Sequence, residues 1–287
     1  MERAFALPAP AKLNLFLHVL GRRPDGYHDL QSVFALIDLA DWIDIERRDD
    51  GVIERQGDVI GAPEADLALR AARLLQQQTN CSYGARIRVT KRIPAGAGLG
   101  GGSSDAATTL VALNRIWQLR LDRTRLAELA LQLGADVPFF VHGSNAFAEG
   151  RGERLTPVAL GPAHYAVIWP QVAVSTKEIF EDPGLTRNTK ATKMADFAAA
   201  GGDSAALAVS GFGRNDLEAV ARRRCPEIDR ALAHLAAHGA ARMTGSGSAV
   251  FTVTRSAEAA RAAVASVPGG WQGWAVQGLP QHPLLPW

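Results

Sequence analysis

Cysteine, long apolar runs and blocks of like charge are all scarce in this sequence. Cys81 and Cys225 are the only cysteines; they are too few for a disulfide framework and lack metal-ligand spacing, so we expect a reducing, cytoplasmic location. No apolar run reaches the roughly 18 residues of a membrane-spanning helix, and we expect no membrane partner. Lys12 and Asn14 interrupt the apolar N-terminal segment, which argues against a signal peptide. The formal net charge is only +2, which gives no reason to expect a nucleic-acid partner.

What the sequence does contain indicates a two-domain globular protein. Of its 287 residues, 47% are hydrophobic and 21% are charged, a balance typical of folded domains, and the length suits two of them. Strand patterns alternate with helical patterns in both halves, which predicts an α/β or α+β fold. The sequence pattern changes after residues 150–153, so we expect a boundary between the two domains within 155–162. We assign the domains to 1–158 and 159–287.

Residues 11–20 alternate as in a strand with one face in the core. The expected core face carries Leu13, Leu15, Leu17 and Val19, and the expected outer face carries Lys12, Asn14, Phe16 and His18. This alternation places Lys12 and Asn14 side by side.

Helical spacing predicts helices over 67–75, 106–117 and 122–133. We expect Asp122 to cap the third of these helices and Gly134 to end it in a left-handed conformation. The alanine-rich segment 191–209 has no clear assignment.

A glycine-rich run at 93–105 is the most informative segment of the chain. It follows a predicted strand at 85–89, precedes a predicted helix, and has five glycines between positions 96 and 102. Glycines let a backbone approach a ligand closely, and the N–H groups of a helix start attract anions. The segment therefore predicts a loop that binds a phosphate chain.

Two familiar phosphate-loop patterns fit this run poorly. A Walker loop needs Gly-Lys-Ser or Gly-Lys-Thr, but Gly102 is followed directly by Ser103. Gly96, Gly98 and Gly101 satisfy the dinucleotide fingerprint, yet the residues after them read as helix where a second strand with an acidic end is required. Neither an ATPase P-loop nor a dehydrogenase is favoured.

Asp136 and Lys12 are the leading candidates for chemistry on a phosphoryl group, which needs a carboxylate near the acceptor and a cation near the moving charge. Asp136 also fits an N-cap of a short turn at 137–140, with Pro138 in its first turn. Lys12 on an outer strand face could simply be solvated. Both interpretations of each residue stay open at this point.

Three further groups have a structural and a functional interpretation. Tyr27 and His28 leave a Pro-Asp-Gly turn and are either exposed or a platform for a ring. The segment 243–249 is either a hairpin turn or a second loop gripping a ligand between two domains. His234 and His238 have zinc-ligand spacing but no third ligand, so we interpret them as surface residues.

Taken in order, these motifs resemble the three signatures of the GHMP kinase superfamily, which match residues 8–14, 94–104 and 243–249. The resemblance implies an α+β fold, with an N-terminal domain like domain 2 of ribosomal protein S5 and a ferredoxin-like C-terminal domain. Further marks lie at 23–28, 134–139 and 187–189. They resemble the branch of the family in the non-mevalonate isoprenoid pathway, whose acceptor is the 2-hydroxyl of a cytidine diphosphate methylerythritol.

The resemblance also implies roles for individual residues. Asp136 would accept the proton of the acceptor hydroxyl, and Lys12 would orient Asp136 and stabilise the transferring group. Asn14 would hold the methylerythritol part, Tyr27 and Phe180 would sandwich the cytosine, and His28 would bond its edge, with Thr176 and Gly245 also at the acceptor. The expected ATP-binding residues are Pro94, Ala95, Gly96, Ala97, Gly98, Leu99, Gly100, Gly101, Gly102, Ser103, Ser104, Lys91, Asp66 and Asp105.

ATP is thus the expected co-substrate, bringing Mg²⁺ with it, since the sequence shows no dedicated carboxylate cage and no tightly bound cofactor is expected. Asp66 and Asp105 stand where relatives often have asparagine, which changes the hydrogen-bond donors available to the nucleoside. Alternatives are a GHMP kinase for mevalonate or homoserine, in which an aromatic clamp has no evident use, and a silent nucleotide- or RNA-binding module, which would not need both Lys12 and Asp136.

Overall fold

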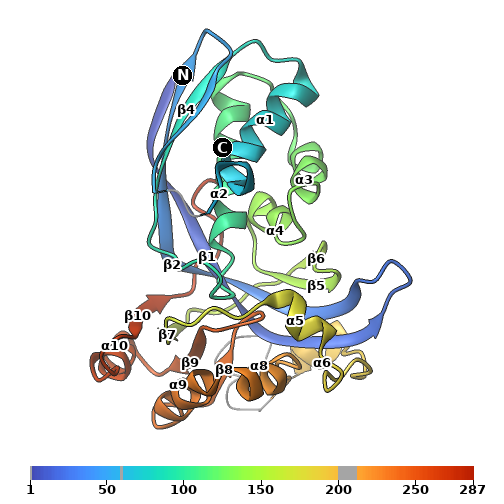
Figure 1. Cartoon of the computed structure of the whole chain (residues 1–287), viewed down its shortest axis with the longest axis vertical. Helices are drawn as coiled ribbons and strands as arrows, with labels where there is room; N and C mark the ends of the chain where they lie inside the picture. Colours follow the sequence, from blue (N-terminus) through green and yellow to red (C-terminus); the bar gives the residue numbers. More distant parts are fainter. Residues whose placement is uncertain (1, 59–60, 200–211) are drawn as a thin grey trace.

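The computed structural model describes residues 2–58, 61–199 and 212–287. The chain forms two bodies, each built on one sheet. The long hairpin formed by β1 (Arg3–Arg22) and β2 (His28–Arg48) runs from the first body down to the second (Figure 1). Among the described residues, no helix is both long and apolar enough to cross a membrane.

The first sheet has six strands in the order β3-β4-β2-β5-β6, with β1 paired to β2. Among its described strands only β3 and β4 run parallel, and this mostly antiparallel sheet with helices on one face is typical of an α+β fold. Its strands are β1 (Arg3–Arg22), β2 (His28–Arg48), β3 (Ile53–Gly57), β4 (Gly84–Thr90), β5 (Ala146–Gly150) and β6 (Arg154–Pro157). Four helices cover one face of it (Figure 1): α1 (Leu67–Thr79), α2 (Gly101–Ile116), α3 (Arg123–Leu131) and α4 (Val137–His142), with a short 3-10 turn at Pro63–Ala65.

The predicted strand at 11–20 lies within β1, but the face expected to point outward is buried. Lys12 and His18 are only 3% and 6% exposed, and Phe16 is fully buried. The covering groups come from distant parts of the chain. The backbone N–H of Lys12 donates to the Leu99 carbonyl at 3.0 Å and that of Asn14 to Thr244 Oγ1 at 2.9 Å.

The second sheet has the strand order β10-β7-β9-β8, and all its pairs are antiparallel. Its strands are β7 (His164–Trp169), β8 (Ala241–Met243), β9 (Val250–Thr254) and β10 (Gln272–Gln277), and its helices are α8 (Glu218–Arg224), α9 (Pro226–Ala236) and α10 (Ala257–Ala265). Helix α9 packs on β8 and β9, and α10 packs on β7 and β10. Strand, helix, two strands, helix and strand in this order form the expected ferredoxin-like arrangement.

The two faces of the second sheet bury different partners. Ala166, Ile168 and Val250 pack with the helices, whereas Tyr165, Val167 and Phe251 pack against β1 and β2. This alternation follows from the period of two along a strand, and it fixes the second body to the long hairpin. Helices α5 (Thr176–Glu181) and α6 (Met194–Ala199) lie beside that hairpin (Figure 1). The rest of the unassigned segment, 200–209, lies outside the described residues.

The helix boundaries follow the predicted caps in part. Asp122 caps α3, its side chain accepting from the Arg125 N–H at 2.7 Å. Helix α2 begins at Gly101, five residues before the predicted start. The predicted left-handed end at Gly134 is wrong, because α3 ends at Leu131 and Gly134 is not among the positive-φ glycines. Its carbonyl instead accepts from the Val137 N–H at 3.2 Å, so the chain turns directly into α4.

The chain passes from the first sheet to the second between Pro157 and His164; a domain boundary at residue 158 stays a prediction. The last residues then return to the first body, which the sequence did not indicate. The Leu279 N–H donates to the Leu36 carbonyl at 2.8 Å and the His282 N–H to the Gly143 carbonyl at 2.7 Å. Leu284 is buried in the first core.

Candidate active site

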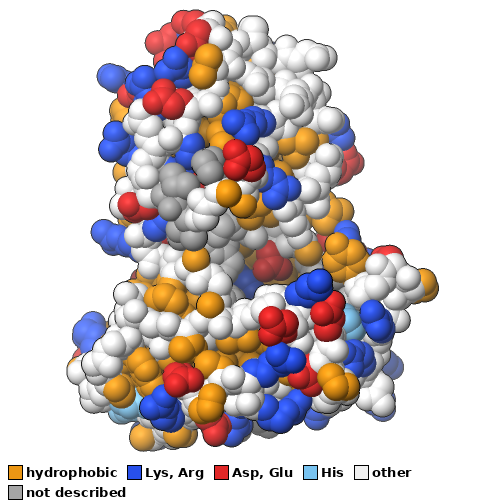
Figure 2. Space-filling model, in the orientation of Figure 1, with side chains coloured by type: hydrophobic (Ala, Val, Ile, Leu, Met, Phe, Trp, Pro, Cys, Tyr) orange, Lys and Arg blue, Asp and Glu red, His pale blue; other side chains and the backbone are white. Residues whose placement is uncertain are grey.

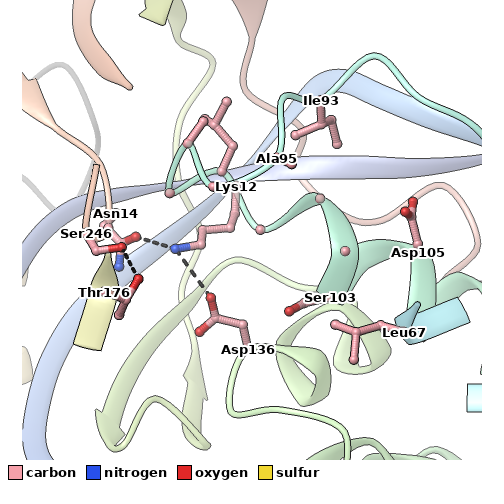
Figure 3. Close-up of a pocket in the computed structure, with 18 of the residues that line it drawn as sticks. Lys12, Asn14, Leu67, Ile93, Ala95, Ser103, Asp105, Asp136, Thr176 and Ser246 are labelled. Atoms are coloured by element: carbon pink, nitrogen blue, oxygen red, sulfur yellow. Dashed lines mark hydrogen bonds and ion pairs between the residues drawn. The ribbon is translucent and has the colours of Figure 1, made fainter. Parts of the chain in front are cut away.

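A cavity of about 530 Å³ lies where the glycine run, α4 and the second body meet. Nearly all the candidate site residues line it: Lys12, Asn14, Asp66, Lys91, the whole run 94–103, Asp105, Asp136, Thr176, Phe180 and Gly245. Tyr27, His28 and Ser104 are not among the lining residues. Figure 3 shows Lys12, Asp136 and Ser103 directed into the same space from three different elements.

The glycine run is shaped by its contact with the loop between β8 and β9. Gly98 has φ +78°, and a Cβ there would overlap the Thr244 carbonyl oxygen. The Ala249 N–H donates to the Ala97 carbonyl at 3.1 Å. The segment 243–249 therefore contains the hairpin turn between β8 and β9 and also forms a second wall of the cavity.

Helix α2 offers its first turn to this cavity. Its N-cap is Gly100, which has no side chain to bond the first N–H groups, and those groups together with the helix dipole attract an anion. Ser103 lines the cavity. Ser104, one helical step further, is fully buried; neighbouring residues on a helix face different directions, so only one of the paired serines reaches the cavity.

Lys12 and Asp136 form an ion pair at the centre of the site. Lys12 Nζ lies 3.5 Å from Asp136 Oδ2 and also donates to Asn14 Oδ1. Asp136 stands at the N-terminus of α4 but its side chain makes no capping bond, so the structure decides against the cap. The carboxylate is 35% exposed while the Lys12 side chain is 4% exposed. A buried cation thus holds a carboxylate that a ligand can reach.

A second charged cluster lines the other end of the cavity. Lys91 Nζ bonds both Asp41 and Asp105, at 2.6 Å to Asp105 Oδ2. Burial raises the pKa of Asp105 to about 7, although the Lys91 charge opposes this. Asp66 caps α1 and pairs with Arg55 at 2.9 Å. The carboxylates of Asp66 and Asp105 are therefore both held by basic side chains.

Asp41 and Arg55 were missed by the sequence reasoning. Asp41 is fully buried and accepts from the Arg92 and Ile93 N–H groups at 2.5 and 2.8 Å, so it anchors the start of the glycine run. An aspartate inside an apolar strand pattern was the available signal, because an unpaired carboxylate is costly to bury.

The aromatic candidates lie together near the opposite end of the cavity, where Phe180 lines it. Phe180 stacks on His28, with ring centroids 5.0 Å apart and an interplanar angle of 26°. Tyr27 is 57% exposed and packs against Arg151, whose Cζ lies 4.9 Å from its ring centroid. Within the described chain no ring contact joins Tyr27 to Phe180, and the cytosine sandwich between them stays a prediction.

Arg187 positions two of these groups at once. Its Nε donates to His28 Nε2 at 3.2 Å, and its Nη2 donates to the Phe180 carbonyl at 2.7 Å. Because Nε2 accepts, the proton of neutral His28 is assigned to Nδ1. Burial lowers the pKa of His28, and the charges of Arg187 and Arg22 lower it further.

Replacing Arg187 by methionine is expected to raise the pKa of His28, because one of the two cations that oppose imidazolium formation is removed. In the wild type, neutral His28 then persists to lower pH than in the variant. NMR titration of the ring measures this directly. Arg223→Met is the matched control, since that side chain pairs with Asp182 and is exposed. An unchanged pKa of His28 in Arg187→Met would show that the Arg187 charge does not act on this ring.

Comparison with known proteins places this geometry in context. The family model of the GHMP kinases N-terminal domain matches residues 66–144, and that of the GHMP kinases C-terminal domain matches 194–271. A protein of Ralstonia nicotianae named 4-diphosphocytidyl-2-C-methyl-D-erythritol kinase is 57% identical over 96% of this chain and 94% of its own. A protein of the same name from Aromatoleum aromaticum is 53% identical over 100% of this chain and 98% of its own.

Solved structures show the same relationship. A crystal structure of 4-(cytidine 5'-diphospho)-2C-methyl-D-erythritol kinase superposes with a TM-score of 0.80 at 35% identity, covering 96% of this chain and 98% of that chain. The homoserine kinase of Cytophaga hutchinsonii superposes with a TM-score of 0.71 over 98% of this chain and 95% of that chain, but at 16% identity. The second likeness shows the fold alone.

Proposed function

The chain belongs to the GHMP kinase family, and from that premise we propose that it phosphorylates the 2-hydroxyl of 4-diphosphocytidyl-2-C-methyl-D-erythritol with ATP, in the non-mevalonate isoprenoid pathway. The observation that carries the proposal is the Lys12–Asp136 pair beside the first turn of α2. A phosphate cradle, a cation and a reachable carboxylate in one cavity are the parts that phosphoryl transfer needs.

In the proposed reaction, an Asp136 oxygen accepts the proton of the acceptor hydroxyl as that oxygen forms its bond to the γ-phosphorus of ATP. The bond between the γ-phosphorus and its bridging oxygen breaks, and ADP leaves. Lys12 fixes the position of Asp136 and stabilises negative charge on the moving group. Because the transition state of such transfers is loose, alignment contributes more than proton removal.

We propose that the acceptor lies along the aromatic end of the cavity. Tyr27 and Phe180 would contact the faces of the cytosine and His28 its edge. Asn14, Thr176 and Gly245 would hold the rest of the molecule. The Asn14 amide is already oriented, because its Nδ2 donates to Ser32 Oγ at 2.8 Å. The Thr176 hydroxyl shares a hydrogen bond of 2.7 Å with that of Ser246.

ATP is the phosphoryl donor in this family, and we assign its triphosphate to 94–103 and its nucleoside to the end near Asp66, Lys91 and Asp105. The site suits a magnesium ion carried by the nucleotide. Within the described ranges no group of three or more His, Cys, Asp or Glu could hold a metal, while Ser103 and Asp136 both face the cavity, and Mg²⁺ favours few protein oxygens plus phosphate and water. When bound, it would neutralise charge on the phosphate oxygens.

The proposal includes a cytoplasmic location, two domains divided at residue 158, and small molecules rather than nucleic acid as ligands. Charged side chains of both signs are interspersed over the face seen in Figure 2. A nucleic-acid surface would instead gather basic residues on one face.

The test of this function is ADP release by the wild-type protein with 4-diphosphocytidyl-2-C-methyl-D-erythritol as acceptor. We expect saturable, acceptor-dependent turnover, and no comparable turnover with mevalonate or homoserine. Absence of turnover with the cytidine diphosphate acceptor, in protein that binds ATP, would overturn the substrate assignment.

A further inference from the structure

The proposed acceptor carries a diphosphate between its cytidine and its methylerythritol, and a site for it needs positive charge along that span. We propose that Arg151 binds this diphosphate. The inference rests on the proposed function and adds a residue that neither the sequence motifs nor the transfer chemistry assigns.

Four basic side chains of the described residues line the cavity, and three of them are paired with carboxylates. They are Lys12, Arg55, Lys91 and Arg151. Lys12 is paired with Asp136, Arg55 with Asp66, and Lys91 with Asp41 and Asp105. Across residues 2–58, 61–199 and 212–287, no carboxylate oxygen lies within 4.0 Å of the Arg151 guanidinium. It is therefore the lining cation whose charge is available to an anionic ligand.

The position of Arg151 also suits a diphosphate. Arg151 stands in the turn between β5 and β6, with its Cζ 4.9 Å from the centroid of the Tyr27 ring. The next residue, Gly152, borders the transfer site, because a Cβ built on it would lie 3.8 Å from Asp136 Oδ1. Arg151 thus lies between the ring assigned to the base and the carboxylate assigned to the hydroxyl. The diphosphate occupies the same place in the covalent order of the acceptor.

The carboxylates near Arg151 have other partners. The Glu153 side chain accepts from the backbone N–H of Arg151 at 2.6 Å and so stabilises the turn. Asp25, the other nearby carboxylate, pairs with Arg23 at 3.2 Å and accepts from the Tyr27 N–H at 3.1 Å. The turn is held through its backbone, which leaves the Arg151 side chain free to contact a ligand.

Calorimetric binding of cytidine and of CDP to wild type and Arg151→Met tests the proposal. A charge-assisted contact to phosphate predicts that the variant binds CDP about 10- to 100-fold more weakly, with cytidine affinity changed less than about threefold. Arg151→Lys keeps the charge without the planar fork and should fall between the two. Arg154→Met is the matched control, because Arg154 is exposed on β6 and does not line the cavity.

Two results would overturn the assignment. Equal weakening of cytidine and CDP would mean that Arg151 acts only by supporting Tyr27, and unchanged CDP affinity would mean that it does not meet the diphosphate. Steady-state kinetics provide a second readout, since Arg151→Met should raise KM for the acceptor and leave KM for ATP unchanged. Failure of the proposed function is distinguishable, because it would abolish turnover in the wild type whatever the CDP binding of the variant.

Discussion

Asp136→Asn is expected to lower kcat by about 10²- to 10⁴-fold, the usual contribution of a positioned acid–base group. Asparagine matches the carboxylate in shape but cannot take the hydroxyl proton, and it removes the negative charge that Lys12 faces at 3.5 Å. The side chain makes no capping bond to α4, so the helix should not be weakened. Acceptor-dependent ADP release measures kcat, and thermal unfolding checks the fold.

Asp122→Asn is the matched control for that substitution. Asp122 caps α3, lies outside the cavity lining and tolerates the change because asparagine caps a helix as well as aspartate does. Its turnover should stay near wild type. If Asp136→Asn retained turnover within about threefold of wild type, far short of the contribution expected of such a group, Asp136 would lose its proposed role, while the assignment of the protein as a kinase would stand on the wild-type reaction.

The features of this fold that depend on neighbouring residues could be predicted from the sequence. Asp122 lies one residue before the helix that it caps, and the glycines of the run at 93–105 directly indicate a loop with unusual backbone angles. The choice between cap and functional carboxylate at Asp136 was not readable. It depends on Lys12, which is 124 positions away in the chain but 3.5 Å away in the fold.

The sequence pattern could not show which residues cover the second face of β1. Alternation in β1 predicts two faces, but Lys12, Phe16 and Asn14 are covered by residues near 99, 213 and 244, respectively. The position of Arg151 could not be predicted either. It stands between two glycines in a segment whose sequence indicated only a domain boundary. Its relation to Tyr27 arises because β2 pairs with β5.

The clearest test of the central ion pair is Lys12→Met, which should lower kcat by about 10²- to 10³-fold, the range seen when one preorganised stabilising group is removed. Methionine keeps the length and the apolar stem of a side chain that is 4% exposed, so packing around Phe34 and Gly100 is largely retained. What disappears is the charge that holds Asp136, bonds Asn14 and, in the proposed reaction, faces the transferring group.

The double variant Lys12→Met with Asp136→Asn shows whether the two side chains act together or contribute independently to kcat. If the two side chains act together, the double variant is no slower than the slower single variant, as expected for residues that depend on each other. Multiplied losses would contradict the pairing and assign each residue a separate role. Lys177→Met is the matched control, because Lys177 is 81% exposed and touches only Glu181 among ion-pair partners in the described chain. We expect full turnover in Lys177→Met and wild-type ATP affinity in Lys12→Met. Together these results would attribute the loss of kcat in Lys12→Met to the phosphoryl-transfer step.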